Sequence, residues 1–464
     1  MRIVLADVRS TRGFTSKDTV VGGYGSRLLP FTKVTRVAVE LKRRLCDVPS
    51  VQLAYLAAIA DRAGCEVVPT RGRPVDGDVA IVLSSLVDHR NECAFADAMR
   101  RNGVRVGFIG LAASKMTHLF EGHADFIIRG ECEAAFSRLV GGERLSGVVD
   151  SPEPPDLDGL PFPRWDLLAE RKTWWRLPFV PRPSSGVFPV LASRSCPEFC
   201  TYCPHRILTP HRVRSVANVV DELAYLCERY PRPYVLFRDP LFSEDRERCL
   251  AICDAIRTRG LDVTFECETR LDRLDRELLD AMHGAGLRSM SFGVEAASPA
   301  TLKKSGRRPI PEAHQRDIIA YCRRIGVATA AFYVLGFLQE DWESIATTID
   351  YAIALGSTVA QFKILTPYPG TPMFKQLEPL LFEADWERFD GFTPTFSHPN
   401  LTPEQLRFLL GAAYTRFYMR PSYLVNYLRI QAGWVRDLSL RLDGRVAARH
   451  ARHEQGSMSR AVTC

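Results

Sequence analysis

The sequence lacks an apolar run of the roughly 20 residues that a membrane-spanning helix needs. It also lacks the start of a signal peptide, because Met1–Asp7 is a short strand-like run that ends in an acid. Its 13 cysteines show none of the regular spacing of a disulfide framework. Together these absences predict a cytoplasmic protein without a transmembrane segment.

An excess of one charge is also absent from most of the chain. The net charge is +7, but from residue 420 onward eight Arg oppose only three acidic residues, so the remainder is nearly balanced. A basic tail of this kind is more typical of a solvated terminus than of a binding arm. We therefore expect no nucleic-acid partner.

A fourth cysteine is missing from the one group of cysteines that has a cluster-binding spacing. Cys196, Cys200 and Cys203 form the pattern C-x3-C-x2-C. Thiolates at these offsets on one tight loop can bind three irons of a four-iron four-sulfur cluster. The fourth iron would then have no protein ligand, and an open iron is a site of reaction. Cys249 and Cys253 repeat the first spacing in an apolar-periodic helix without a third thiol, which indicates core packing instead.

The loop from Ser193 to His205, with Tyr202 just before its third cysteine, resembles the signature of the radical S-adenosylmethionine (SAM) superfamily. In that family the open iron holds the methionine part of SAM, and the reduced cluster cleaves SAM to a 5′-deoxyadenosyl radical. The resemblance implies a [4Fe–4S] cluster on the three thiols and SAM beside Tyr202. It also implies an electron donor such as a flavodoxin or ferredoxin.

Residues 1–150 alternate short apolar runs with amphipathic stretches. Buried strands that alternate with helices predict a doubly wound, flavodoxin-like (Rossmann-like) α/β domain, whose ligands lie at the carboxyl ends of its strands. The expected strands are Arg2–Asp7, Glu66–Thr70, Asp78–Ser85, Arg105–Leu111 and Asp125–Gly130, and the expected helices are Val51–Ala63, Asn91–Arg101 and Glu131–Val140.

This domain resembles the cobalamin-binding domains that precede the cluster domain in many radical SAM proteins. An S-x-L motif at 84–86, a glycine after the fourth strand and the segment 124–133 match that family, whereas its D-x-H-x-x-G motif is absent. The resemblance implies bound cobalamin without a His ligand from this domain. The alternative is a domain of the same fold that has lost its cobalamin site. The implied cobalamin contacts are Ser84, Leu86, Gly110, Gly130 and Glu131.

Two segments depart from the simple strand–helix alternation. Residues 10–48 are an insertion with a glycine-rich turn at 17–27, which we interpret as an ordinary surface loop, the alternative being a segment that lines the substrate side. Residues 151–186 are rich in Pro and predict an extended linker between two domains.

A second strand–helix repeat runs over residues 187–375. Six units predict a partial (β/α)6 barrel of the TIM type, with its site at the carboxyl ends of the strands. The cluster loop follows the first of these strands, where that site belongs. The expected strands are Val187–Ser193, Tyr234–Asp239, Asp262–Arg270, Ser289–Glu295, Ala328–Leu335 and Val359–Leu365.

Polar residues at these strand ends are candidates for binding SAM. Gly293-Val-Glu295 resembles the family's fourth-strand motif, whose acid accepts hydrogen bonds from the SAM ribose. Asp239, Glu268 and Arg270 also point toward the mouth of the barrel, and structural ion pairing is the alternative role for the two acids. The run Gly336–Asp341 departs from the family's G-x-P-G-E motif, which gives no support for a SAM contact there.

Residues 376–464 are expected to form a helical region with a basic tail. Thr402-Pro-Glu-Gln405 is a capping box with Pro at the first helical position, so a helix should begin there. The segment Arg416–Tyr423 resembles a stretch of the cobalamin-dependent radical SAM methylases.

The leading hypothesis is a cobalamin-dependent radical SAM methyltransferase that uses the 5′-deoxyadenosyl radical and methylcobalamin to methylate an unactivated carbon of a small-molecule intermediate. The main alternative is a cyclase or rearrangement enzyme of the same architecture without net methyl transfer. A methylthiotransferase is disfavoured because no C-terminal β-barrel pattern is present and the N-terminal cysteines are scattered. A non-catalytic cobalamin sensor is disfavoured because it has no need of an open iron.

Overall fold

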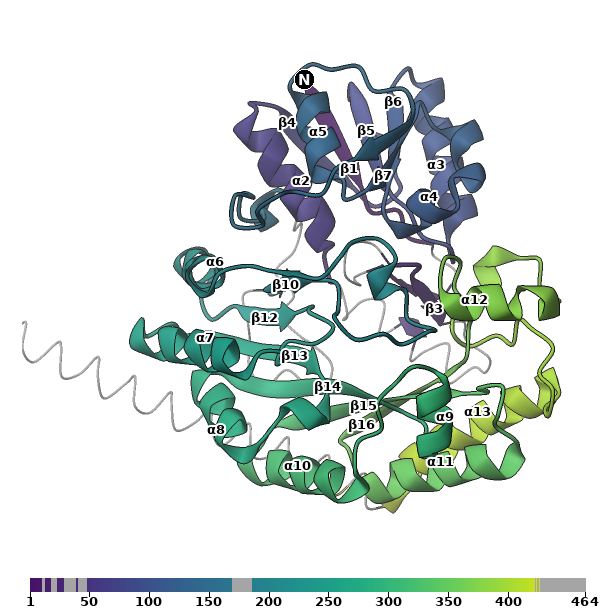
Figure 1. Ribbon diagram of the computed structural model, residues 1–464. Helices are drawn as coiled ribbons and strands as arrows, with labels where there is room; N and C mark the ends of the chain where they lie inside the picture. The colour runs from purple at the N-terminus through teal and green to yellow at the C-terminus, as the bar shows by residue number, and fades with distance from the viewer. Residues whose placement is uncertain are drawn as a thin grey trace, which may run out of the picture.

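The computed structural model describes residues 1–10, 13–17, 23–28, 39–40, 48–168, 186–421, 423 and 425. Two six-stranded parallel sheets form its framework, one above the other in Figure 1. Within these residues, no helix has both the length and the apolar character needed to cross a membrane.

The N-terminal sheet has the strand order β4-β1-β5-β6-β7-β8, and all its pairs are parallel. This is the predicted doubly wound arrangement. Only the edge strand β8 was not expected, since its short, half-polar sequence is largely exposed and gives little periodic signal. The strands are β1 (Arg2–Ala6), β4 (Glu66–Thr70), β5 (Val79–Leu83), β6 (Arg105–Ile109), β7 (Phe126–Gly130) and β8 (Gly147–Ser151), and the helices are α2 (Val51–Arg62), α3 (His89–Arg101), α4 (Leu111–Lys115) and α5 (Glu133–Val140).

Helix α2 joins the two halves of the molecule. Ser50 caps it by accepting a hydrogen bond from the backbone N–H of Leu53. The next ten residues, 51–60, are all buried, because the helix packs against its own sheet on one side and contacts strand β9 of the central sheet on the other. One continuous apolar core therefore extends from β1 through α2 into the barrel.

The central sheet has the order β16-β15-β14-β13-β12-β9, with every pair parallel. The predicted partial six-stranded barrel is confirmed. Its strands are β9 (Val187–Val190), β12 (Tyr234–Phe237), β13 (Thr264–Thr269), β14 (Leu287–Glu295), β15 (Ala328–Leu335) and β16 (Val359–Ile364), and its helices are α6 (Val216–Arg229), α7 (Arg246–Thr258), α8 (Arg276–Ala285), α9 (Pro299–Lys304), α10 (Glu312–Ile325) and α11 (Trp342–Leu355).

The residues after β16 cover one end of the barrel. Helix α12 (Pro372–Leu377) is followed by mostly irregular chain up to residue 401, so this part is less helical than expected. Helix α13 (Pro403–Tyr418) begins at Thr402 with the predicted capping box, completed by the side chain of Gln405. The basic tail beyond residue 425 lies outside the described residues.

The interpretation of residues 10–48 as an ordinary surface loop is wrong for the part that the structure describes. Strands β2 (Phe14–Ser16) and β3 (Ser26–Leu28) form a small hairpin-like sheet. Lys17 and Tyr24 are each only 2% exposed. The Lys17 Nζ lies 2.6 Å from a carboxylate oxygen of the equally buried Glu92, which compensates the cost of burying the charge.

The first half of the Pro-rich segment packs against both domains. Trp165 is buried with its ring centroid 6.1 Å from that of Phe188, and the Arg164 N–H donates to the Ala54 carbonyl at 3.1 Å. The expected linker therefore adheres to both domains as far as residue 168. Its remaining residues, 169–185, lie outside the described part of the chain.

Candidate active site between the two domains

The loop with the three cysteines follows β9 and is closed at its base by a two-stranded ribbon. Strand β10 (Ser193–Arg194) pairs antiparallel with β11 (Arg212–Val213). Ser195 adopts the left-handed conformation with φ of 65°, and its hydroxyl donates to the His205 carbonyl at 3.0 Å. These contacts fold the intervening residues into a compact loop at the carboxyl end of the first barrel strand.

The three thiols suit an iron–sulfur cluster. Cys196, Cys200 and Cys203 are all free and partly buried on this one loop. An Nη of Arg307 lies 3.8 Å from the Cys200 sulfur. Over the described residues, no three His, Cys, Asp or Glu side chains converge as they would on a single metal ion. A [4Fe–4S] cluster does not require that the three side chains converge on one ion, because each thiolate binds its own iron.

Glu295 is brought to the cysteine loop by an irregularity at the end of β14. Its φ is 68°, and the pairing with β15 shifts register between Gly293 and Glu295. A Cβ on Gly293 would lie 2.1 Å from a Glu295 carboxylate oxygen, so a larger residue there would displace the carboxylate from this position. Burial raises the pKa of Glu295, although the Arg307 guanidinium 3.6 Å away opposes that rise. The carboxylate is thus held near Tyr202, whose ring packs edge-on against Phe337 at 5.5 Å.

Asp239 has a structural task at this site. It is 1% exposed, and its carboxylate accepts hydrogen bonds from the Ala192 N–H at 3.1 Å and the Ser193 hydroxyl at 2.5 Å. Asp239 therefore fixes the chain where β9 leads into the cysteine loop. Its predicted contact with SAM stays a prediction.

Glu268 and Arg270 lie at the end of β13 in ion pairs. Arg238 contacts the Glu268 carboxylate at 2.8 Å. Arg270 makes a two-pronged contact with Asp272, at 3.0 Å for each hydrogen bond, and also donates to the Arg308 carbonyl. Structural ion pairing thus accounts for both side chains in this structure, and a SAM contact for either one stays a prediction.

The predicted cobalamin residues gather at the carboxyl edge of the N-terminal sheet. Ser84, directly after β5, accepts a hydrogen bond from the Ala113 N–H at 2.9 Å, and Leu86 is fully buried. Gly110 follows β6 and Gly130 is the last residue of β7, with φ of 103° and 97°, which other residues rarely adopt.

Glu131 faces the barrel. Its carboxylate oxygens lie 3.0 Å from Arg194 and 2.5 Å from Arg212, and Arg194 also contacts Glu133 at 2.7 Å. These four side chains form a buried ion cluster between the domains. The predicted cobalamin contact of Glu131 stays untested, and an interface role is what its contacts support.

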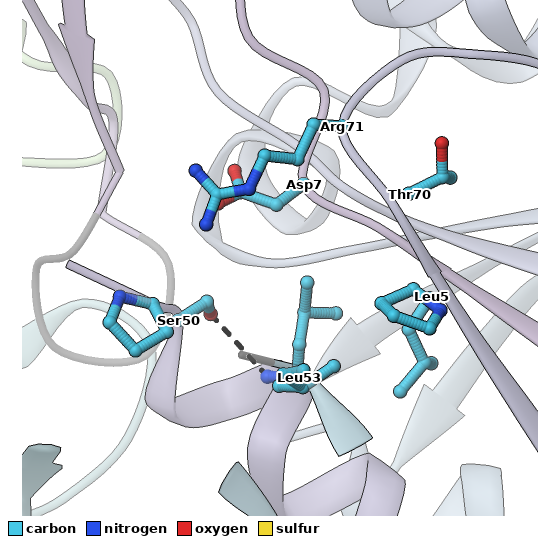
Figure 2. Close-up of a pocket in the computed structure, with 9 residues that line it drawn as sticks. Leu5, Asp7, Ser50, Leu53, Thr70 and Arg71 are labelled. Atoms are coloured by element: carbon cyan, nitrogen blue, oxygen red, sulfur yellow. Dashed lines mark hydrogen bonds between the residues drawn. The ribbon is translucent and has the colours of Figure 1, made fainter. Parts of the chain in front are cut away.

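The end of β1 holds no imidazole. Arg9 stands where the missing D-x-H-x-x-G motif would place its His, and it contacts Asp7 at 2.5 Å and the Val48 carbonyl at 2.9 Å. Burial alone would raise the pKa of Asp7, but Arg9, Lys17 and Arg71 together hold it below its usual range. The small cavity beside Asp7, about 30 Å3, is shown in Figure 2 with Arg71 and Asp7 side by side, and it has room for little more than one water.

Cobalamin bound by this protein should therefore have no histidine from the N-terminal domain on its cobalt. His89 does not occupy the position of the missing motif, and its Nδ1 lies 2.8 Å from the Leu86 carbonyl in a buried turn. Electron paramagnetic resonance of the cob(II)alamin form should show no imidazole superhyperfine splitting. A splitting that His89→Ala removes would contradict this expectation.

A larger cavity, about 190 Å3, lies where the two domains meet. The cysteine loop contributes Ser195, Pro204 and His205, and the N-terminal domain contributes Leu111. The ring of Tyr24, from the insertion, stacks on that of Tyr368 at 5.4 Å and 7°, and the Tyr24 hydroxyl donates to the Pro369 carbonyl at 2.6 Å. The remaining lining residues are Gly23, Gly25, Ser26, Leu208, Thr209, Lys363 and Tyr368.

Sequence patterns did not single out several residues of this site. His205 is the last residue of the loop that resembles the family signature, so its place in that loop would have indicated it. Arg307 belongs to a run with four cations in six residues, 303–308, which is only a weak signal. Tyr24 and Lys363 reach the cavity through long-range packing and carry no local signal.

Comparisons with known proteins identify the class. Residues 190–352 match the family model described as the radical SAM superfamily. An uncharacterized methyltransferase of Pyrococcus horikoshii is 30% identical over 333 residues, which cover 67% of this chain and 71% of that protein. The chain belongs to the radical SAM superfamily and is an enzyme of that group.

More distant similarities concern the whole architecture. The radical SAM methyltransferase TsrM of Kitasatospora setae, solved with cobalamin and a [4Fe–4S] cluster, has the same fold with a TM-score of 0.60 at 16% identity, over 89% of this chain and 91% of that one. An anaerobic magnesium-protoporphyrin IX monomethyl ester cyclase of Rubrivivax gelatinosus is 26% identical over 60% of this chain and 50% of its own length. The fold is thus that of a radical SAM barrel preceded by a doubly wound domain.

Proposed function

We propose that this chain is a cobalamin-dependent radical SAM methyltransferase that methylates a carbon of a small molecule held between its two domains. The observation that carries the proposal is the cavity of about 190 Å3, which the cysteine loop and the carboxyl edge of the N-terminal sheet both line. A group held at either edge would face the other across one shared space.

The residues of the site fit the cofactors that the family uses. Cys196, Cys200 and Cys203 would hold the cluster, and Glu295 would accept hydrogen bonds from the ribose of SAM. When bound, these groups supply a carbon-centred radical, and cobalamin supplies a carrier for the methyl group. On the opposite side of the cavity, cobalamin would be bound by Ser84, Leu86, Gly110 and Gly130.

The chain's own residues position the cysteine loop and line the cavity. The ion cluster of Arg194, Arg212, Glu131 and Glu133 fixes the cysteine loop against the end of β7. The stacked rings of Tyr24 and Tyr368 line the cavity on the side of the insertion. Side chains that cover part of such a site limit the access of water and competing hydrogen donors to a reactive radical.

A second candidate is ring formation or rearrangement without net methyl transfer. Its support is the similarity to the magnesium-protoporphyrin cyclase, although this chain matches only half of that protein. The same cavity and the same cofactor-binding residues would serve either reaction. The methyltransferase is preferred because a relative that is 30% identical and matches over two thirds of both chains is named a methyltransferase.

The nucleoside products of SAM distinguish the two candidates. The protein should be reconstituted without oxygen, supplied with SAM and a reductant, and assayed by chromatography with and without cobalamin. We expect S-adenosylhomocysteine to form only when cobalamin is present, and 5′-deoxyadenosine to form in both cases. Formation of 5′-deoxyadenosine alone, with cobalamin bound, would reject the methyltransferase and favour the cyclase.

A further inference from the structure

The cysteine loop exposes a large aromatic side chain on the side away from the cavity. Phe199 stands immediately before Cys200 and is 60% exposed. The guanidinium of Arg206 lies 5.0 Å from the centre of its ring. Neither residue lines the cavity between the domains. Exposed aromatic and Arg side chains are the types most enriched at the energetic centres of protein interfaces.

Two cations of the barrel stand on the helix that leads into a contact with this loop. The backbone that follows α9 packs directly on the loop, because the Thr201 N–H donates to the Ser305 carbonyl at 3.0 Å. Only glycine fits at position 306, since a Cβ there would lie 2.4 Å from the Phe199 carbonyl oxygen. Lys303 and Lys304 are the last two residues of α9, directly before this contact, and both are exposed.

The charge of this surface is not balanced. Within the described residues, Lys303 and Lys304 have no carboxylate within ion-pair distance. The nearby Glu198 is shared between Arg273 and Arg308, at 3.1 Å from each. We call the surface made by Phe199, Arg206, Lys303, Lys304 and Arg308 the loop patch.

We propose that the loop patch docks an acidic one-electron donor protein of the flavodoxin type. The proposal rests on the proposed function, which requires the cluster to be reduced. The anionic flavin hydroquinone of the donor loses one electron and becomes the neutral semiquinone, and the cluster gains that electron. Because Phe199 is bonded to the ligand residue Cys200, a donor seated on the patch approaches the cluster closely, and the opposite face of the loop stays free for SAM.

Binding can be measured without turnover. Oxidised flavodoxin should be titrated by calorimetry into the reconstituted protein and into Lys303→Glu/Lys304→Glu. Reversing two charges in a complementary interface should weaken binding by about tenfold or more, and the parent's affinity should fall as salt screens the charges. Phe199→Ala should weaken binding by about tenfold as well.

Matched controls are available in this chain. Arg101→Glu/Arg144→Glu reverses two exposed cations on the N-terminal domain, and Phe408→Ala removes a 63% exposed aromatic ring from α13. Both should bind flavodoxin like the parent. Unchanged binding of the Lys303→Glu/Lys304→Glu variant, or an affinity that does not respond to salt, would overturn the proposal. The proposal would also be overturned if that variant changed its oligomeric state but still bound flavodoxin. The loop patch would then be an interface between two copies of the chain.

An assay with a small-molecule reductant tests the proposed function independently of the docking of flavodoxin. With dithionite, Lys303→Glu/Lys304→Glu should reduce its cluster and cleave SAM at the parent's rate. With flavodoxin hydroquinone, both rates should fall by about tenfold. If even the parent fails to cleave SAM with dithionite, the proposed function is wrong, whereas the calorimetric comparison still decides whether the patch binds flavodoxin.

Discussion

Replacing Cys196, Cys200 or Cys203 with Ala should remove most of the bound iron and all cleavage of SAM. The three thiols lie on one loop held by the β10–β11 ribbon and by Ser195, so the remaining two cannot move to replace a missing ligand. Loss of one thiolate leaves two irons without protein ligands, and the cluster should not survive purification. Iron and sulfide analysis, the visible absorption of the cluster and the yield of 5′-deoxyadenosine measure the effect.

Cys249→Ala is the matched control. Cys249 and Cys253 have the same spacing as the first two loop cysteines but are both 1% exposed within α7, which confirms the prediction of core packing. The variant should keep its iron and its SAM cleavage and should lose only some stability. Loss of cleavage in Cys249→Ala together with activity in Cys200→Ala would show that the ligand set is wrong.

The sequence was sufficient to predict those features that depend on interactions between residues close together in the chain. Inner strands such as β5 are buried on both faces of the sheet, so they appear as apolar runs with polar ends, and β4 and β15 match their predicted bounds. The cysteine spacing and the capping box at Thr402 are likewise patterns within a few residues. Features of this kind can be recognised before any tertiary contact is known.

Contacts between distant segments could not be predicted in the same way. Arg307 reaches the sulfur of Cys200 across 107 positions, and Tyr24 bonds to Pro369 across 345. A glycine-rich insertion is typical of exposed loops, and nothing in its local pattern indicates that Lys17 and Tyr24 are buried. Their place is set by Glu92 and Tyr368, which belong to other elements.

The same reasoning explains why Glu131 was expected to contact cobalamin. Its family segment ends β7 at the edge where cofactors bind, so proximity to that edge was correctly inferred. The edge also meets the barrel, however, and Arg194 lies two residues before the first cluster cysteine. The ion cluster therefore connects the end of β7 directly to the β10–β11 ribbon of the cysteine loop, and its removal should loosen both.

Arg194→Met should lower the free energy of unfolding by about 3 to 5 kcal/mol, because it leaves a buried carboxylate without its cation. Arg194 is 3% exposed, and the Glu133 carboxylate that it contacts at 2.7 Å is nearly as buried. Glu131 keeps its contact with Arg212 in this variant, so Glu133 carries most of the cost. Adding Glu133→Gln should recover part of the loss, since a neutral amide is much less costly to bury than an unpaired charge.

Urea unfolding of the parent, both single variants and the double variant completes a mutant cycle that isolates the Arg194–Glu133 interaction. Arg129→Met is the control, because Arg129 pairs with Asp150 on the neighbouring β7 and β8 strands with both side chains largely exposed. An exposed pair contributes little, so this variant should unfold at the parent's urea concentration. If Arg194→Met also unfolds there, the buried ion cluster does not hold the domains together. If it is destabilised but the double variant recovers nothing, the cost lies in packing and not in the unpaired charge.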